Sequence, residues 1–350
     1  MSRESNPPVD LRRRNALRQV GSAALATFMI PRIAYAAATR KFDLMMAPQG
    51  SGVYDAYAVL QTRAPEHHEW LRLQTIETGG FNYNVTYMSK FSKKWPNTAF
   101  GSATVLEWAA GKGVAPFYPD PVAAARDFRV IGGMGATGNF WVTFDPKIKT
   151  PKDFVGKRVA TGLLTQNEWG MYQRMLLDGW GLTDKLTSLN PLGPDKNIEA
   201  MIDGKVDVAT MVSFFTPDMG LVIPAGPYNN LLASDRQFHI VDVPAEMIED
   251  YNKKTGGNFE IRKYPPNKLS KQPKPFTTFG DYMTVSAHKS FADDLAYEFA
   301  KLWVKMGSVV AKYNALGKVW TPEGIASPVK SNPDRAHPGA LRAYKELGLV

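Results

Sequence analysis

The residues best suited to chemistry stand at turns where a predicted strand gives way to a predicted helix. One such turn is Gly50-Ser51-Gly52, followed by Tyr54, and another is Gly162 with the polar run Thr165-Gln166-Asn167. The first N–H groups of a helix have no partner within it and lie at the positive end of the helix dipole, so they favour a negatively charged ligand. Hydroxyl and amide side chains add neutral donors. These turns therefore predict a site for a carboxylate that is held largely without lysine or arginine.

Covalent and metal chemistry have little support in the sequence. The chain has no cysteine, which excludes a thiol enzyme. Its five histidines include the neighbours His67 and His68, which lack the i, i+4 spacing that places two imidazoles on one helical face. The Gly50-Ser51-Gly52 turn lacks both the G-x-S-x-G pattern of a nucleophile elbow and the lysine of a phosphate loop. We therefore expect a protein that is not an enzyme, with no catalytic residue, no metal and no cofactor.

Clear local signals surround the second polar turn. A short helix is predicted to open near Thr150, with Asp153 in its first turn. A buried strand is expected at Arg158-Val159-Ala160, and after Gly162 the chain should enter a helix that carries Met171. This order of strand, turn and helix start is the geometry that leaves backbone N–H groups available to a ligand.

Two segments of the chain follow a similar plan. Residues 84–102 and 197–213 each read as a helix, a tight turn, a buried strand and a final small polar residue. This weak internal similarity predicts an α/β fold with two lobes of matching topology. Ligands of such sheets bind beyond the carboxyl ends of the strands. Four turns should therefore meet at one cleft: residues 50–54, 78–80, 162–168 and 213–217.

The lobe boundaries are predicted from two strands that cross between the lobes. Residues 139–144 read as a strand that leaves the first lobe, and residues 282–286 as one that returns to it. Lobe 1 is then residues 37–140, completed by residues 285–350, and lobe 2 is residues 141–284. Two crossings make a hinge.

The N-terminal segment is predicted to be a removable export signal. The pair Arg13-Arg14 precedes the apolar, small-residue run Val20–Ile30, and Ala34-Tyr35-Ala36 supplies a cleavage site. Residues 1–36 thus form a signal peptide, of the twin-arginine type or for the general route. Because the lipid of a bacterial lipoprotein is attached to a cysteine, we expect a soluble periplasmic protein, cleaved after Ala36, that is not a lipoprotein.

The charge of the chain argues against nucleic acid as a partner. The formal net charge is +9, but residues 1–36 hold six arginines and two acidic residues, so four of these charges belong to the leader. The densest basic cluster, Lys90–Lys94, is short and is typical of a solvated helix face.

In their order and spacing, several segments resemble the TAXI group of solute-binding proteins that serve TRAP transporters. The matching segments are residues 140–212, Gly50–Tyr54 after the strand 42–46, Thr78-Gly79-Gly80 and the C-terminal residues 337–349. The resemblance covers nearly all of the chain after the leader. It implies a two-lobed periplasmic binding protein fold, type II-like, in which each lobe is a mixed sheet flanked by helices and a two-strand hinge joins the lobes.

The resemblance and the turns together give a set of expected ligand contacts. These residues are Gly50, Ser51, Val53, Tyr54, Thr78, Gly79, Ser102, Thr161, Gly162, Thr165, Gln166, Asn167, Trp169, Ser213, Phe214 and Pro217. Backbone N–H groups and hydroxyls would hold the carboxylate, while Tyr54, Trp169 and Phe214 would shape specificity.

One segment departs from the family pattern. Relatives commonly place a Gly-Ser-Gly-Thr type loop after the strand that ends near residue 161, whereas this chain has residues 163–169 with larger side chains. Glu168 in this loop would repel an anion unless it faces a cationic part of the ligand or solvent. The identity of the acid, aliphatic or aromatic, therefore stays open.

The resemblance implies a protein that closes on a small organic anion and delivers it to a TRAP-type membrane permease. We expect a monomer. The alternatives are a binding protein of the same fold that serves an ABC-type or tricarboxylate-type importer, and an enzyme of this fold, which the missing cysteine disfavours.

Overall fold

The computed structural model describes residues 38–350, and the predicted export signal lies outside the described residues. The strands are β1 (Arg40–Met45), β2 (Leu71–Ile76), β3 (Thr98–Ala103), β4 (Phe128–Thr143), β5 (Arg158–Thr161), β6 (Ser188–Pro191), β7 (Val208–Phe215), β8 (Val222–Pro224), β9 (His239–Val241), β10 (Glu260–Tyr264), β11 (Phe276–Gly280) and β12 (Tyr282–His288).

Helices connect most of these strands. The α-helices are α2 (Gly52–Arg63), α3 (Phe81–Lys90), α4 (Thr104–Lys112), α5 (Tyr172–Gly179), α6 (Pro194–Ile202), α7 (Pro227–Ala233), α8 (Ala245–Thr255), α9 (Asp293–Val310), α10 (Pro322–Ser331) and α11 (Pro338–Glu346). Shorter helical turns are η1 (Ala64–Glu66), η2 (Ser92–Asn97), η3 (Ala123–Asp127), η4 (Pro151–Phe154), the π-helical η5 (Asn167–Met171), η6 (Thr183–Lys185), η7 (Ala315–Val319) and η8 (Pro333–Arg335).

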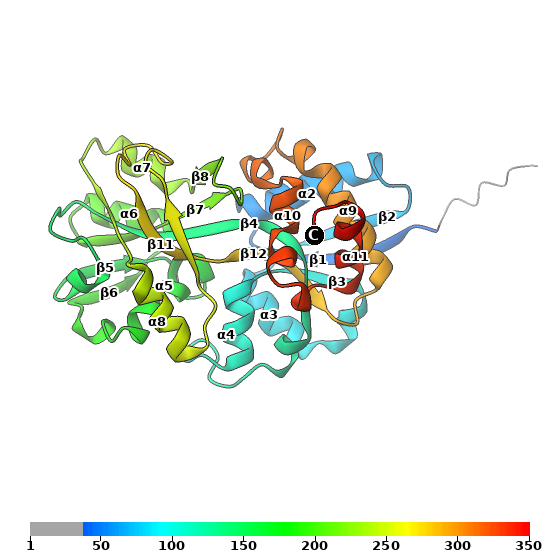
Figure 1. Ribbon diagram of the computed structural model, residues 1–350, viewed down its shortest axis with the longest axis horizontal. Coiled ribbons are helices and arrows are strands. Elements are labelled where there is room, and N and C mark those ends of the chain that lie inside the picture. Colours follow the sequence, from blue (N-terminus) through cyan, green and yellow to red (C-terminus); the bar gives the residue numbers. More distant parts are fainter. Residues whose placement is uncertain (1–37) are drawn as a thin grey trace, which may run out of the picture. The chain divides into compact units, whose positions relative to one another are not determined.

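The strands form one mixed sheet in the order β2-β1-β3-β12-β4-β7-β5-β6. β1 runs parallel to β2 and β3, and β5 runs parallel to β6 and β7, whereas β12 and β4 pair with their neighbours in antiparallel fashion. The short strands β8 and β9 pair with β7 and β4, and β10 pairs with β11. Figure 1 shows β4 running between the helices and strands of the two lobes. The prediction of a two-lobed α/β fold is confirmed.

The long strand β4 belongs to both lobes. Its residues 128–136 pair with β12, and its residues 136–143 pair with β7, so that Ala136 faces Tyr282 on one side and Phe215 on the other. The strand therefore exchanges partners at Ala136. The lobe boundaries remain a prediction, and this exchange close to residue 140 supports it.

The two crossing segments are bonded to each other. The N–H of Thr137 donates to the main-chain oxygen of Asp281 at 2.9 Å, between β11 and β12. A Cβ atom at the adjacent Gly280 would come within 1.8 Å of the Thr137 oxygen, so only glycine permits this close approach. The crossing is therefore a fixed, hydrogen-bonded junction and not a pair of independent linkers.

The two predicted repeats share a buried asparagine. Asn84 in α3 donates to the main-chain oxygen of Gly101 in the following strand β3, at 3.0 Å. Asn197 in α6 exchanges two hydrogen bonds with the main chain of Thr210 in the following strand β7. Both side chains are fully buried, so each satisfies strand groups that would otherwise be costly to bury.

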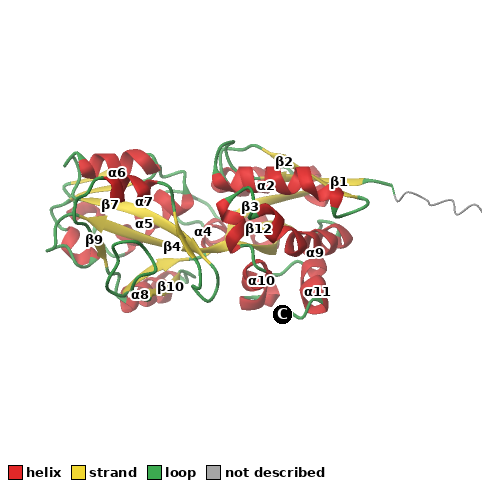
Figure 2. Cartoon of the chain, turned by 90° about the horizontal axis from the view of Figure 1, so that it is seen from above, coloured by secondary structure: helices red, strands yellow, loops and turns green. Residues whose placement is uncertain are grey.

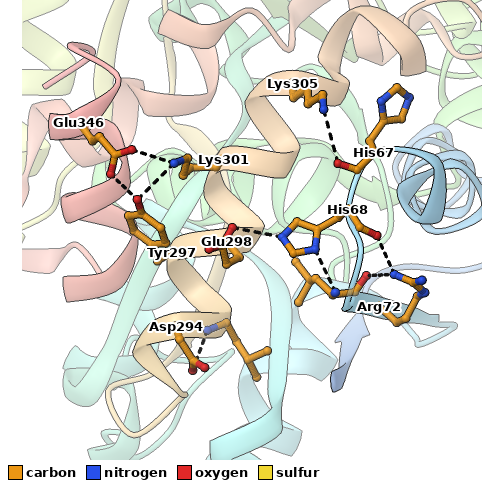
Figure 3. Close-up of polar contacts among 11 residues, drawn as sticks. His67, His68, Arg72, Asp294, Tyr297, Glu298, Lys301, Lys305 and Glu346 are labelled. Carbon is orange, nitrogen blue, oxygen red and sulfur yellow. Dashed lines mark hydrogen bonds and ion pairs between the residues drawn. The ribbon is translucent and has the colours of Figure 1, made fainter. Parts of the chain in front are cut away.

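Helix α9 is the longest helix of the described residues, with 18 residues. It packs against α2, α10 and α11 of lobe 1, and in Figure 2 helices α9, α10 and α11 lie on one side of strands β1 and β2. Figure 3 shows polar contacts of its outer face: Lys301 donates to Glu346 of α11 at 2.8 Å, and Glu298 contacts His68 at 3.1 Å. These contacts fasten α11 and the loop before β2 to the same helix.

Candidate functional site

A cavity of about 590 Å³ is lined by residues of both lobes. Lobe 1 contributes residues 50–53 before and in the first turn of α2, residues 79–81 at the start of α3, and residues 314–316 at the start of η7. Lobe 2 contributes residues 165–169 and residues 223–227, the latter leading from β8 into α7. Further lining residues are Ala47, Pro48, Pro194, Phe214 and Met283.

Helix starts converge on this cavity. The first residues of α2, α3 and α6, which are Gly52, Phe81 and Pro194, all line it, as do the first residues of the shorter η5, α7 and η7. The positive ends of several helix dipoles therefore face one space. No lysine, arginine or histidine is among the lining residues. Any electrostatic attraction that the lining offers an anion would therefore come from backbone groups.

The start of α2 is organised by its capping residue. The hydroxyl of Ser51 accepts a hydrogen bond from the N–H of Tyr54 at 3.2 Å, and Asp55 accepts one from the N–H of Gly50 at 3.3 Å. Within the described residues, the N–H groups of Gly52 and Val53 have no hydrogen-bond partner. These two donors line the cavity and are available to a ligand oxygen.

The loop that begins at Gly162 is closed on itself. The N–H of Gly162 donates to the main-chain oxygen of Trp169 at 2.7 Å, so this N–H is bonded within the loop. A Cβ at Gly162 would lie 2.3 Å from the Cβ of Trp169, which explains the glycine. The side-chain oxygen of Gln166 accepts from the N–H of Leu163 at 3.0 Å, so Gln166 also holds the loop in shape.

Glu168 faces neither solvent nor a cation. Its side chain is buried, and its two carboxylate oxygens accept hydrogen bonds from Asn139 at 2.9 Å and from Asn167 at 3.1 Å. Its carboxyl is also hydrogen-bonded to that of Asp281. Burial, followed by the charge of Asp281, raises the pKa of Glu168 well above its usual value. This direction favours the neutral form of the carboxyl, which repels an anion less than an ionised glutamate would.

Asp281 is the charged member of this pair. Its carboxylate accepts from the hydroxyl of Tyr172 at 2.8 Å, from the N–H of Val105 at 3.1 Å and from the hydroxyl of Thr137 at 3.1 Å. Burial raises its pKa, while the hydrogen bonds from Tyr172, Glu168, Val105 and Thr137 lower it. Because Asp281 has more donors than Glu168, we place the shared proton on Glu168.

Part of the predicted contact set lies at the cavity. The residues that line it are Gly50, Ser51, Val53, Gly79, Thr165, Gln166, Asn167, Trp169 and Phe214. Their contact with a ligand stays a prediction. Among them, Asn167 directs its side-chain N–H groups at Glu168 and the hydroxyl of Tyr172, so its available ligand-binding group is the amide oxygen.

The remaining predicted residues lie away from the cavity lining. Ser102, Thr161 and Ser213 are fully buried within strands. The hydroxyl of Thr161 donates to Gly162, and that of Ser213 pairs with the hydroxyl of Tyr264 at 2.6 Å. These three residues do not line the cavity, because the sheet itself encloses their side chains, and their contact with a ligand stays a prediction.

The other predicted residues that do not line the cavity are at turns. Thr78 donates its hydroxyl to the main-chain oxygen of Met46 at 2.8 Å, and Tyr54 packs against the core of lobe 1. Gly162 is enclosed by Trp169, and Pro217 is exposed beyond the end of β7. The turns were predicted correctly, but each of these residues faces the protein or solvent instead of the cavity.

Several lining residues were missed by the sequence prediction. Phe81 follows the Gly79-Gly80 turn, and Gly226-Pro227 has the form of a helix start, so both had a readable signal. No sequence signal marked Met283 and the segment 314–316 as cavity residues, because they reach the cavity only through the packing of β12 and η7.

Residues 38–350 contain no group of three histidine, aspartate or glutamate side chains placed to hold a metal ion. No helix of this part of the chain is long and apolar enough to span a membrane.

The chain belongs to the NMT1-like family, whose model matches residues 47–348. A comparison with curated protein sequences gave no match.

Solved structures were also compared with the chain. One is R. palustris Rpa4515 with adipate, at 14% identity and a TM-score of 0.49, covering 80% of this chain and 88% of that one. A TctC solute-binding protein from Polaromonas has 12% identity and a TM-score of 0.49, covering 88% and 98%. MatC from Rhodopseudomonas palustris with bound malate has 12% identity and a TM-score of 0.46, covering 88% and 96%.

Proposed function

We propose that the protein is a solute-binding protein that captures a small carboxylate-bearing molecule between its lobes and performs no reaction on it. The observation that carries this proposal is the convergence of the starts of α2, α3 and α6 on a cavity whose lining has no cationic side chain. Backbone N–H groups at helix starts bind anions well, and neutral donors allow release as well as capture.

The side chains that line the cavity indicate the polarity and size of the part of the ligand beyond its carboxylate. Val53, Phe81, Trp169, Phe214 and Ile223 present apolar surface, and the polar groups are gathered at the helix starts. A cavity of about 590 Å³ is within the ordinary size range of small-molecule sites. The arrangement suits an organic acid with an apolar body, aliphatic or aromatic.

Two segments of the chain are proposed to bind the ligand. The N–H groups of Gly52 and Val53 approach from lobe 1, and the Thr165-Gln166 segment approaches from lobe 2. A ligand that bonds to both would favour the closed arrangement of the lobes by the difference between its affinities for the closed and open forms.

The setting of this function is proposed from the sequence. The predicted export signal supports a periplasmic location, and the resemblance to TAXI proteins supports a TRAP-type permease as the recipient of the ligand. Uptake of the ligand is measured with membranes that contain either a TRAP-type or a tricarboxylate-type permease, in the presence of the binding protein. The proposed recipient is wrong if the protein stimulates uptake only by the tricarboxylate-type permease.

Identification of the co-purified ligand tests the proposed function. The protein is purified without added acids and denatured, and mass spectrometry is used on the released small molecules. Thermal unfolding is then followed with added acids, starting from adipate and malate, which are named for two of the compared structures. We expect a carboxylic acid that is recovered unchanged and raises the melting temperature. A neutral or cationic ligand, or conversion of the acid to a product, would overturn the proposal.

A further inference from the structure

A buried acid pair connects the ligand loop to the crossing strands. Glu168 lies in η5 and lines the cavity, whereas Asp281 lies between β11 and β12. Asn167 donates to the carboxyl of Glu168 at 3.1 Å and to the hydroxyl of Tyr172 at 3.4 Å, and Tyr172 donates to Asp281 at 2.8 Å. One hydrogen-bonded chain therefore joins the two carboxyl groups, which also contact each other. The exposed fractions of the two residues are 6% and 0%. Two carboxylates in contact and away from water cannot both stay ionised at low cost, so they share a proton.

The pair is held by elements of both lobes. From β4, Asn139 donates to Glu168 at 2.9 Å and Thr137 donates to Asp281 at 3.1 Å. From the start of α4 in lobe 1, the N–H of Val105 donates to Asp281 at 3.1 Å. The pair therefore bonds the ligand loop of lobe 2 to the hinge and to lobe 1 at the same time.

The charged and titratable groups around the pair are few. Tyr172 of α5 donates to Asp281, and burial followed by the charge of Asp281 raises the pKa of Tyr172 well above its usual value, so it stays neutral. Arg262 of β10 donates to the main-chain oxygen of Asp281 at 3.0 Å and is paired with Glu260 at 3.6 Å. Arg262 thus contacts the main chain of Asp281 and not its carboxylate. The shared proton is therefore what reduces the negative charge of the two carboxyl groups.

We propose that Glu168 is a positioning residue whose shared proton with Asp281 keeps the ligand loop, residues 162–171, closed against the hinge. When this proton is lost, two negative charges face each other in a buried site, and the loop must move to let water reach them. The meaning of this movement for ligand capture rests on the proposed function. The movement itself is a property of the protein without any ligand.

The raised pKa of Glu168 sets the direction of the pH effect. Because its pKa in the folded protein lies above the usual value, the neutral pair persists to a higher pH than an exposed glutamate would and is lost as the pH rises through the pKa of the pair. Release of one proton makes opening of the loop about tenfold more frequent for each pH unit between the usual pKa of an exposed glutamate and the raised pKa of the pair, and opening levels off above the pKa of the pair.

Hydrogen exchange of the ligand-free, mature protein tests the proposal. Exchange of the backbone of residues 162–171 is measured as a function of pH and corrected for the intrinsic effect of pH. The variant Glu168→Gln keeps the shape of the neutral acid, and its amide can accept from Asn139 and donate to Asp281 without a titrating proton, although it loses the bond that Asn167 donates to the second oxygen. Between the usual pKa of glutamate and the raised pKa of the pair, we expect loop opening to increase by about tenfold per pH unit in the natural protein and to be independent of pH in Glu168→Gln.

The control is Glu77→Gln, which removes an exposed carboxylate that accepts from the N–H of Gln49. This variant should keep the profile of the natural protein. Equal corrected profiles in the natural protein and in Glu168→Gln would overturn the proposal.

Infrared spectroscopy of the natural protein gives a second test that needs no variant. A carbonyl band of a protonated, buried carboxyl group should persist above the usual pH range of glutamate and disappear as the pH passes the pKa of the pair, where loop opening levels off. Absence of this band at pH values where exposed carboxyls are ionised would also overturn the proposal. Neither test of the Glu168–Asp281 pair uses a ligand. Their outcome is therefore independent of whether the ligand of the proposed function is identified.

Discussion

The side-chain nitrogen of Asn139 donates to both the main-chain oxygen and the carboxylate of Glu168, at 2.9 Å in each case. Asn139 lies in the part of β4 that pairs with β7, and Glu168 lies in the loop that lines the cavity. One buried side chain thus fastens the ligand loop of lobe 2 to the strand that crosses between the lobes.

The variant Asn139→Asp should destabilise the protein. It keeps the shape of the side chain but replaces its donor with an acceptor, so the two oxygens of Glu168 lose their partner. We expect a loss of about 1–3 kcal/mol in the free energy of unfolding, measured by urea denaturation. The matched control is Asn229→Asp on the exposed face of α7, which should cost much less. Equal losses in both variants would show that the bond to Glu168 contributes little.

Ligand affinity should depend on the polar run of the ligand loop. Thr165→Ala and Gln166→Ala should each weaken binding of the identified acid by about tenfold, because a charged group is left under-bonded in a closed site. The Gln166 variant also loses the bond to Leu163, so its loop should exchange amide hydrogens faster. Calorimetry measures the affinity, and Thr62→Ala on α2 is the control. Equal affinities of the three variants for the acid would contradict this prediction.

Gly162→Ala should damage the site through packing. The added Cβ would meet the Cβ of Trp169 at 2.3 Å, and overpacking of this kind costs about 1–3 kcal/mol. We expect lower thermal stability and binding weaker by at least about tenfold, because the loop must shift. Gly193→Ala, where nothing lies within 4 Å of the added carbon, is the control. The packing account fails if both variants bind and unfold as the natural protein does.

An ion pair at the start of β5 should contribute stability that depends on pH. Arg158 donates to both carboxylate oxygens of Asp207, at 2.7 and 3.1 Å, and its N–H donates at 2.8 Å. The hydrogen bonds from Arg158 lower the pKa of Asp207 below its usual value. A lowered folded-state pKa gives stability that is present above the unfolded-state pKa and is lost as the pH falls through the folded-state pKa.

Asp207→Asn should therefore be less stable than the natural protein near neutral pH, and the difference should shrink in acid. Urea unfolding of both proteins from neutral pH to below the usual pKa of aspartate measures this. The pair is partly exposed, so its effect should also decrease with added salt. A difference that is constant with pH would contradict the prediction.

Local signals explain why much of the fold was predictable. Thr150 and Asp153 form the capping box of η4, and the strand expected after them is observed as β5. The helix expected to carry Met171 is observed as η5, which contains Met171 and is followed directly by α5. Each of these depends on residues close together in the chain. The turns that surround the cavity were found for the same reason.

The orientation of buried side chains was not predictable. Strands such as β3 and β7 are buried on both faces, so their sequences lack the alternation that tells inward from outward residues. Ser102 and Ser213 were therefore taken as ligand contacts although the core encloses them. The pairing of Glu168 with Asp281 was also beyond the sequence, because only the crossing of β4 and β12 brings two residues so far apart into contact.

The most direct test of the central claim is calorimetry of the identified acid against its neutral amide. The claim is that uncharged donors at converging helix starts hold a carboxylate, and the amide has nearly the same size without the charge. We predict that the acid binds at least about tenfold more tightly than the amide, a difference of about 1.4 kcal/mol or more. Equal affinities of the acid and the amide would contradict the account and would show that the cavity selects for the apolar body of its ligand.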